Sequence, residues 1–310
     1  MIRDKAITET IKKGYNIKIS SIKLIRESPD NKVFLIKSDH KNYVARVSKR
    51  DVRNDVLFET TWLDYLLKHK IPVVKIIKAA NNRLFSIYNK SVIVLFKFAK
   101  GRSLEINPNK KPDLKKAESA ARELAKIHNI SYKAKIKISG KRNILTEIDR
   151  ALKIKDKFIR LSEGGDKFID ELIFYRKWVR ENSHNKYLVH NDYRPGNVFF
   201  NGDKVSAILD FDWSCKGPAI KDVAHSLCEW SFPDGAKNHW QDVFDAFFKS
   251  YNQIAKNKIK LNQNLYRWIC FSCLSDTATY FTDLANENIF KKIESSYMYQ
   301  KFLYFRKFIK

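Results

Sequence analysis

The sequence predicts an α+β protein in which a small, strand-rich N-terminal region precedes a larger, mainly helical region. Alternating apolar residues, which indicate strands, are concentrated in the first hundred positions, whereas the later sequence has the three- and four-residue spacing of helices. The chain has 310 residues, of which 44% are hydrophobic, so it can bury a substantial core. We expect two regions, 1–98 and 99–310, with a hinge near residues 96–102.

A helix and a hairpin are predicted at the start of the N-terminal region. Residues 4–13 have a helical pattern, and Gly14 is a suitable residue to end that helix. Two strand-like segments, KVFLIKS and NYVARVS, follow at 32–38 and 42–48, and the residues between them favour a turn. These two segments are therefore predicted to pair as a β-hairpin.

A second helix is predicted from about residue 54 to residue 69. Val56, Glu59 and Leu63 recur in it at helical spacing, which places Glu59 on the apolar face. A buried carboxylate is costly unless a cation meets it, so we expect a basic partner for Glu59. The later segment SVIVLFK is predicted to be a central strand, and it runs into a linker that ends at Gly101.

The strongest functional signal is a group of polar residues in the segment 188–212. His190, Asp192 and Asn197 occupy a turn-rich loop, and Asp210 follows a hairpin whose turn is an Asn-Gly pair. Phosphoryl transfer needs a carboxylate to orient the acceptor hydroxyl and take its proton, and Mg²⁺ needs oxygen ligands beside the phosphates. Asp192 suits the first role, and Asn197 and Asp210 suit the second, with the spacing of a kinase catalytic loop and metal loop.

The same stretch resembles the aminoglycoside phosphotransferase and choline kinase superfamily. The resemblance rests on the Pro-Gly pair before Asn197 and on DFDWSCKGPAIKDVA, which begins at Asp210; ILDFDWSCKGPAIKDVAHSLCEW is particularly similar to homoserine-kinase-like members. The resemblance implies a two-lobed, protein-kinase-like fold, Mg-ATP as the phosphate donor, and a small-molecule hydroxyl acceptor bound by the C-terminal helices. It also makes Asp222 a structural aspartate rather than a catalytic one.

The resemblance assigns roles in the N-terminal region as well. Arg46 stands where the family carries a basic residue that contacts the phosphates, often lysine, and Glu59 would then be its partner. Because no glycine-rich loop is present, backbone amides near Ser28 and Asn31 are expected to help hold the nucleotide. The alternative is that Arg46 and Glu59 form an ordinary ion pair between two elements.

Two histidines are assigned structural roles. We expect His190 to be a hydrogen-bonding scaffold for the catalytic loop, and His128 to cap its own helix. Neither histidine is a candidate for proton transfer.

The acceptor is expected to carry an amine. From Ala219 onward the chain has 13 basic and 9 acidic side chains, so this part is much less basic than the rest of a chain whose net charge is +26. Four carboxylates there could attract a cationic acceptor, or could be solvated helix faces: Glu229, Asp234, Asp276 and Asp283. Five aromatic residues could also line the pocket, although most are expected in the core: Trp213, Trp230, Trp240, Trp268 and Tyr280. A homoserine-like molecule leads by resemblance, followed by an aminoglycoside or a choline-type cation.

The high positive charge leaves one alternative class open, a nucleic-acid-binding protein on an inactive kinase scaffold. The complete set of Asp192, Asn197 and Asp210 argues against it, and dispersed lysines favour solvated faces, so no specific nucleic-acid partner is expected. The N-terminus lacks the apolar core of a signal peptide, and no apolar run is long enough to span a membrane. Four cysteines are too few for a secreted disulfide framework, so we expect a cytoplasmic protein. The sequence does not indicate an oligomeric state.

Overall fold

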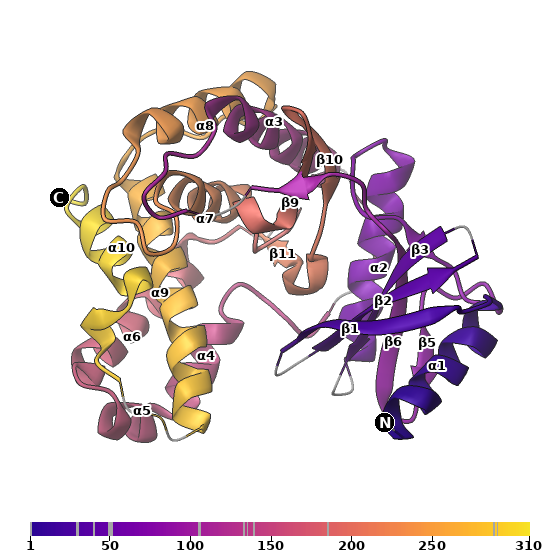
Figure 1. Ribbon diagram of the computed structural model, residues 1–310. Helices are drawn as coiled ribbons and strands as arrows, with labels where there is room; N and C mark the ends of the chain where they lie inside the picture. Colours follow the sequence, from indigo (N-terminus) through magenta and orange to yellow (C-terminus); the bar gives the residue numbers. More distant parts are fainter. Residues whose placement is uncertain are drawn as a thin grey trace.

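The computed structural model describes residues 2–28, 31–39, 41–48, 52–104, 107–132, 134, 136–138, 140–184, 186–287, 289 and 291–310. It has a β-sheet N-terminal region and a helical C-terminal region, as the sequence predicts (Figure 1). Within the described residues, no helix has both the length and the apolar character needed to cross a lipid bilayer.

The N-terminal region is an antiparallel sheet with one helix on each face. Its order is β1-β2-β3-β6-β4, with β5 paired to β6. The strands are β1 (Ser21–Glu27), β2 (Asn31–Ser38), β3 (Lys41–Ser48), β4 (Ile76–Ile77), β5 (Ser86–Tyr88) and β6 (Ser91–Lys97). The helices are α1 (Ile2–Tyr15) and α2 (Arg53–Lys68). Because side chains alternate along a strand, Ile93 and Leu95 of β6 pack in the cluster that contains α1, while Val92 and Val94 pack in the cluster that contains α2.

The predicted hairpin, second helix and central strand are confirmed. Strands β2 and β3 pair in antiparallel register, and β6 lies between β3 and its short neighbours. The predicted end of the first helix is wrong, since α1 continues through Gly14 to Tyr15. Asn16 takes the left-handed conformation instead, with φ 50°. Strand β1 was not predicted, and its mostly exposed side chains explain why it lacks an apolar pattern.

The C-terminal region is a helical bundle with two small sheets. The helices are α3 (Leu114–Ser131), α4 (Thr146–Lys153), α5 (Lys155–Leu161), α6 (Gly165–Asn182), α7 (Ala219–Ser231), α8 (Gln241–Ile254), α9 (Gln263–Asn286) and α10 (Tyr297–Arg306). One sheet joins β7 (Arg102–Ser103), β9 (Val198–Asn201) and β10 (Lys204–Ile208), and the other pairs β8 (Tyr187–Val189) with β11 (Cys215–Gly217). Single 3₁₀ turns occur at Pro195–Asn197, Phe211–Trp213 and Ile293–Ser295. The hairpin predicted before Asp210 is thus β9 and β10.

The two regions are tied together on both sides of the site. The Ile208 amide donates to the Pro72 carbonyl at 2.7 Å, which connects the end of β10 to the sheet region. In the first turn of α2, the Asp55 carboxylate accepts hydrogen bonds from the backbone amides of Lys141 and Arg142 at 2.6 and 3.2 Å. These contacts fix the loop after β10 and the segment before α4 against the sheet region.

Candidate active site

The loop that follows β8 is held by one buried carboxylate, Asp222 of α7. Its two oxygens accept the backbone amides of His190 and Asn191, both at 2.7 Å. Asn191 has φ 67°, a left-handed conformation that these hydrogen bonds stabilise. Although burial by itself would raise the pKa of Asp222, the hydrogen bond from His128 helps to lower it to about 2. The contacts match the structural role expected for Asp222.

The expectation that His128 caps its own helix is wrong. Its Nε2 contacts Asp222 at 3.2 Å and its Nδ1 contacts the Tyr251 hydroxyl at 2.8 Å. His128 therefore connects α3 to α7 and α8. The physical reason is burial: the side chain points into the helix interface, where both ring nitrogens find partners.

His190 links the catalytic loop to the end of β10. Its Nε2 contacts the Leu209 carbonyl at 2.9 Å, and its Nδ1 accepts the Asp192 amide at 3.3 Å. A ring that donates through Nε2 and accepts through Nδ1 is neutral. Complete burial accordingly lowers the pKa of His190. The expected scaffold role agrees with these contacts.

Asp192 is oriented by two neighbours in the same loop. Asn197 Nδ2 donates to Asp192 Oδ2 at 2.8 Å, and Arg194 Nε lies 3.3 Å from Asp192 Oδ1. The Asn197 side chain is buried, and its backbone carbonyl accepts the Leu209 amide at 2.9 Å. The loop and the end of β10 therefore lie next to each other, as the predicted hairpin requires.

Strand β10 ends at Ile208, and Asp210 lies two residues further on in a left-handed conformation, with φ 61°. Burial raises the pKa of Asp210 well above its usual range, and the neighbouring carboxylates of Asp212 and Asp192 raise it further, against the attraction of Arg46. Asp212 Oδ1 is buried and has no hydrogen-bond partner in the described part of the chain. Crowded carboxylates with an unsatisfied oxygen are a donor set that suits a divalent cation. Asn197, whose amide nitrogen faces Asp192, can add its amide oxygen to that set.

Arg46 of β3 and Glu59 of α2 form a buried ion pair. Both side chains are nearly inaccessible to solvent, and the guanidinium also lies 5.7 Å from the centre of the Phe96 ring. Burial alone would lower the pKa of Arg46, but the charges of Glu59 and Asp212 raise it, so the guanidinium is always charged. The expected partnership is confirmed as a contact, while a role in nucleotide binding stays a prediction.

Ser28 and Asn31 frame the end of the β1–β2 connection. The Ser28 amide donates to the Asn31 carbonyl at 2.9 Å, and the Asn31 amide donates to Ser28 Oγ at 3.1 Å. These two amides are therefore used within the turn, and residues 29–30 between them lie outside the described residues. The Asn31 side chain donates to Asp212 Oδ2 at 3.3 Å, which joins the turn to the loop after β10.

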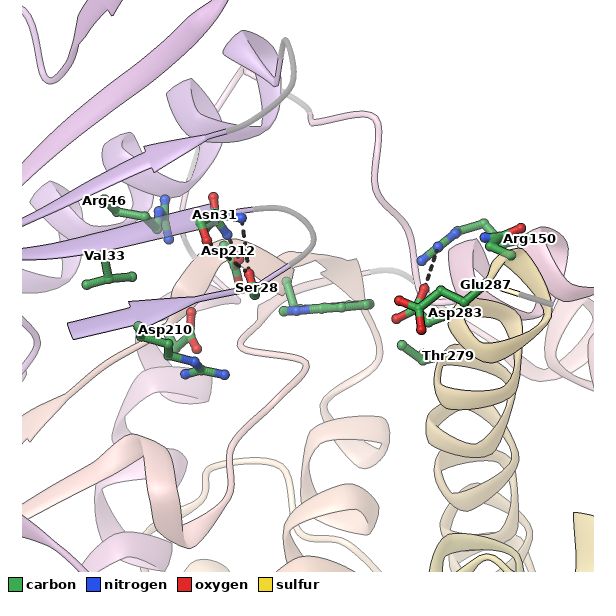
Figure 2. A pocket seen from close by; sticks show the side chains of 13 residues that line it. Ser28, Asn31, Val33, Arg46, Arg150, Asp210, Asp212, Thr279, Asp283 and Glu287 are labelled. Atoms are coloured by element: carbon green, nitrogen blue, oxygen red, sulfur yellow. Dashed lines mark hydrogen bonds and ion pairs between the residues drawn. The ribbon is translucent and has the colours of Figure 1, made fainter. Parts of the chain in front are cut away.

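A sheet-side cavity of about 370 Å³ contains part of the predicted nucleotide and metal site, but Glu59 and Asn197 are not among the residues that line it. It is lined by Ser28, Asn31 and Arg46 from the sheet region and by Asp210 and Asp212 from the loop after β10. Figure 2 shows these side chains facing Thr279 and Asp283 of α9 across open space. The structure thus places five charged and polar residues near one another, three from the sheet region and two from the loop after β10, which is distant in sequence.

A helix-side cavity of about 470 Å³ adjoins the first, and it contains Asp192. Trp213, Thr279 and Asp283 line both cavities. All four carboxylates predicted for the acceptor line it, namely Glu229, Asp234, Asp276 and Asp283. Among the five aromatic candidates, Trp213 and Tyr280 line it, whereas Trp230 and Trp268 are fully buried in the core.

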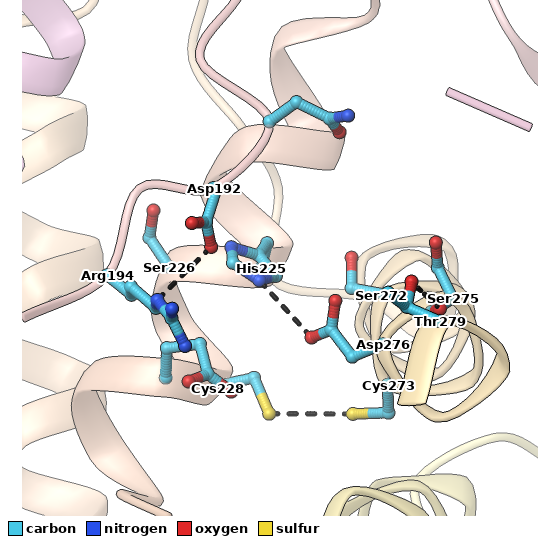
Figure 3. A network of polar contacts seen from close by, with 12 residues as sticks. Asp192, Arg194, His225, Ser226, Cys228, Ser272, Cys273, Ser275, Asp276 and Thr279 are labelled. Atoms are coloured by element: carbon cyan, nitrogen blue, oxygen red, sulfur yellow. Dashed lines mark hydrogen bonds and ion pairs between the residues drawn. The ribbon is translucent and has the colours of Figure 1, made fainter. Parts of the chain in front are cut away.

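These carboxylates are already paired, which the sequence did not indicate. Lys301 of α10 is buried and donates to Glu229 at 2.7 Å and to Asp234 at 2.9 Å. His225 Nε2 lies 3.3 Å from Asp276 (Figure 3). Asp283 lies 3.2 Å from Arg150. The wall is therefore rich in charge without a large excess of negative charge.

One group on this wall has the composition of a metal site. His225, Glu229 and Asp276 offer ligand atoms that lie within 4.8 Å of one another. Lys301 already supplies a positive charge to Glu229, so a divalent cation here would face electrostatic competition. Among the described residues, Arg46 is the cation that lowers the pKa of Asp210 against two neighbouring carboxylates, and Asp212 has an unsatisfied oxygen, so the Asp210 group is better suited to a metal.

Sequence reasoning missed three basic residues of the helix-side wall, Arg194, Lys221 and His225. A signal was present: Lys221, His225 and Glu229 follow one another at four-residue spacing, which places three polar residues on one stripe of the apolar helix α7. Arg194 could have been noticed because it lies two residues after Asp192.

The fold and the two adjoining cavities define a kinase-like phosphotransferase. Residues 21–255 match the model of the phosphotransferase enzyme family. The match spans most of the chain, and the chain therefore belongs to that family.

Curated relatives and solved structures agree with this membership. The chain is 24% identical over 244 residues to homoserine kinase of Zymomonas mobilis, covering 76% of this chain and 72% of that protein. It is 25% identical over 236 residues to homoserine kinase of Sinorhizobium medicae, covering 71% and 67%. An amicoumacin kinase in complex with AMP-PNP, Ca²⁺ and its ligand has a TM-score of 0.75 at 15% identity, covering 98% of this chain and 92% of that chain. Choline kinase from Streptococcus pneumoniae has a TM-score of 0.67 at 12% identity, covering 99% and 98%. The structural matches establish the fold, which is the one that the sequence predicts.

Proposed function

We propose that this phosphotransferase moves the γ-phosphate of Mg-ATP onto a hydroxyl group of a small, amine-bearing molecule. The observation that carries the proposal is the position of Asp192. Its carboxylate lines the helix-side cavity, while Asp210 and Arg46 line the adjoining sheet-side cavity. A hydroxyl bound beside Asp192 would therefore face a nucleotide held between Arg46 and Asp210.

Asp192 is proposed to orient the acceptor hydroxyl and to take its proton. Phosphoryl transfer depends mainly on positioning and on electrostatic stabilisation, so the orientation of this carboxylate matters more than a shifted pKa. Asn197 fixes Oδ2 and Arg194 approaches Oδ1, which supports a defined orientation. A residue in this role must come within hydrogen-bond distance of the hydroxyl.

Arg46 is proposed to bind the phosphates of the donor, with Glu59 as its positioning residue. A guanidinium held by a buried carboxylate on one side presents its remaining N–H groups in a fixed direction. Ser28 and Asn31 would border the same phosphates from the β1–β2 turn. Because their own amides are used within that turn, their contribution would come from side chains or from neighbouring amides.

Asn197 and Asp210 are proposed to hold Mg²⁺, with Asp212 beside them. A cation there supplies charge neutralisation for the phosphates, and its charge would also stabilise the ionised form of Asp210. The unsatisfied Asp212 oxygen supports this assignment.

The amine on the acceptor is the least direct part of the proposal. Its support is the set of carboxylates on α7 and α9, together with the names of relatives that act on homoserine, choline and aminopropanol. Because these carboxylates are already paired with cations of the protein, the cavity does not suit a highly charged polycation. A small molecule with one amine fits the wall better than an aminoglycoside does.

The cytoplasm, where ATP is abundant, remains the expected location of the protein.

The test is ADP release with an acceptor panel of homoserine, choline, aminopropanol and an aminocyclitol, together with a neutral polyol and an anionic sugar phosphate. We expect turnover with at least one amine-bearing member, dependent on Asp192 and on Mg²⁺. Turnover limited to neutral or anionic acceptors would contradict the proposal that the acceptor carries an amine. If ATP hydrolysis depends on Asp192 but no acceptor in the panel is phosphorylated, the result would support the use of ATP and contradict the proposed class of acceptor.

The net charge of +26 keeps nucleic-acid binding as an alternative function. Titration of duplex DNA and RNA at increasing salt distinguishes the two. We expect weak binding that disappears steeply as salt rises, which is the behaviour of unspecific charge. Nanomolar, sequence-selective binding at physiological salt, without phosphotransfer, would favour the alternative.

A further inference from the structure

Lys221 is a buried cation without an acidic partner among the residues that the structure describes. It lies in the first turn of α7, lines the helix-side cavity, and is 3% exposed. Its Nζ donates to the Asn191 carbonyl at 3.2 Å, and no carboxylate forms an ion pair with it within the described ranges. An ammonium group has three donors, and a buried charge is costly when it is unpaired.

The other buried or half-buried cations in and beside this cavity differ from Lys221 in having acidic partners, whereas Arg26, which also lines the cavity, is exposed. Arg194 lies 3.3 Å from Asp192, and Lys301 contacts both Glu229 and Asp234. Arg150 contacts Glu147 at 2.6 Å and also Asp283. Internal pairing is thus the rule on this wall, and Lys221 departs from it.

An acid lies near Lys221 without pairing with it. Burial would raise the pKa of Asp276, but the charges of His225 and then of Lys221 lower it. The Asp276 side chain is 39% exposed, so one face of it is open to the cavity. The cavity therefore presents a buried cation and a partly open carboxylate to the same space, with Asp192 beside them.

We propose that Lys221 binds a carboxylate group of the acceptor while Asp276 binds its ammonium group, so that the acceptor is a small hydroxy amino acid. This inference rests on the proposed function, because it assigns two binding groups to the acceptor cavity of a phosphotransferase. Lys221 is joined to Asn191, the residue before Asp192, so a carboxylate on Lys221 would lie close to the catalytic loop. The side-chain hydroxyl of a short amino acid could then reach Asp192.

Matched pairs of acceptors that differ only in the carboxylate test the inference. L-Serine is compared with ethanolamine, L-threonine with 1-aminopropan-2-ol, and L-homoserine with 3-aminopropan-1-ol. We expect kcat/KM to be about 10- to 100-fold higher for the amino acid in at least one pair, the usual effect of one charge-assisted hydrogen bond. Equal use of the amine and the amino acid in every pair that is turned over would overturn the inference.

Variants then assign the effect to residues. Lys221→Met should lower kcat/KM much more for the amino acid than for its amine partner, so that the preference within the pair is lost, and Lys221→Arg should restore part of the preference. Lys216→Met, at an exposed lysine on the adjacent strand β11, is the control. An equal loss for both members of a pair would mean that Lys221 only supports the Asn191 carbonyl, and would refute the assignment. If Lys221→Met does not fold, the Lys221→Arg variant and the selectivity of the wild-type enzyme still test whether Lys221 binds the acceptor carboxylate.

Failure of the inference and failure of the proposed function are separable. An enzyme that uses none of the six acceptors but retains Asp192-dependent ATP hydrolysis would refute the amino-acid acceptor and keep the phosphotransferase. An enzyme without Asp192-dependent use of ATP would refute the proposed function itself.

Discussion

The sheet-side and helix-side cavities differ in how far their carboxylates are balanced by cations of the protein. On the sheet side, Asp210 and Asp212 crowd together with Arg46 as the balancing cation, and an oxygen of Asp212 is unsatisfied. On the helix side, the carboxylates are matched by cations from other helices, as in the pair of Glu229 and Lys301. Under the proposed function, the sheet side would receive positive charge together with its ligand, whereas the helix side would distinguish ligands by the position of their charges.

The largest effect is expected at Asp192, which lines the helix-side cavity. Asp192→Asn removes the proton acceptor but keeps the size of the side chain, so kcat should fall by about 10²- to 10⁴-fold. Binding of Mg-ATP, measured as a stabilising thermal shift, should persist because the sheet side is untouched. Asp203→Asn, in the exposed turn between β9 and β10, is the control. Turnover close to wild type would remove Asp192 from its proposed role.

Lys301 tests whether the helix side depends on internal pairing. Lys301→Met leaves Glu229 buried without its partner, and breaking a buried pair destabilises a protein by roughly 3–5 kcal/mol. Chemical denaturation should show this loss, while Lys307→Met, at an exposed lysine after the same helix, should leave the free energy of unfolding unchanged. An unchanged stability in Lys301→Met would mean that Glu229 is reached by water.

Arg46 and Glu59 provide the equivalent test on the sheet side. Arg46→Ala should lower kcat/KM for ATP by about 10- to 100-fold, since charge-assisted contacts to phosphate are lost. Glu59→Ala should also weaken the use of ATP, and the double variant should lose less than the sum because the residues act as a unit. Arg83→Ala, at an exposed arginine, is the control. Additive losses would indicate that the ion pair is not part of the nucleotide site.

The smallest expected effect is a pH dependence of stability at His225 and Asp276. Burial by itself would lower the pKa of His225, but the charge of Asp276 raises this pKa above 6.5. The contribution of protonated His225 to stability is therefore complete below pH 6.5 and is lost as pH rises through the folded pKa. The pKa of Asp276 is lowered below 3.8, so its contribution is lost only as pH falls through that lower value. Asp276→Asn should therefore reduce the free energy of unfolding by about 1 kcal/mol near pH 5.5 and by less near pH 8.5. A difference that grows with pH would contradict the pair.

The two cavities also differ in how far the sequence predicts them. Asp192, Asn197 and Asp210 lie within one short segment with characteristic spacing, and Glu59 was detectable because a carboxylate interrupts an apolar face. The helix-side pairs were not predictable in this way. Lys301 and Glu229 are 72 positions apart and meet only because α10 packs against the bundle. Local periodicity carries no information about which distant side chain a buried charge will meet.

The fold was predicted for similar reasons. Strands β2, β3 and β6 alternate or are continuously apolar, and α2 has clear helical spacing, so these elements were recognised. Strand β1 lies at the edge of the sheet and has little buried surface, and β7 and β11 are too short to form a pattern. The boundary between residues 98 and 99 remains a prediction.

The contacts of Asp222 have a consequence for the order in which the molecule assembles. This carboxylate joins residues that are 94, 32 and 31 positions away along the chain, at His128, His190 and Asn191. Contacts between distant positions form late, because the chain between them must first be arranged. The catalytic loop should therefore acquire its shape only after α3 and α7 have docked, and recovery of ATP turnover during refolding should lag behind recovery of helical structure.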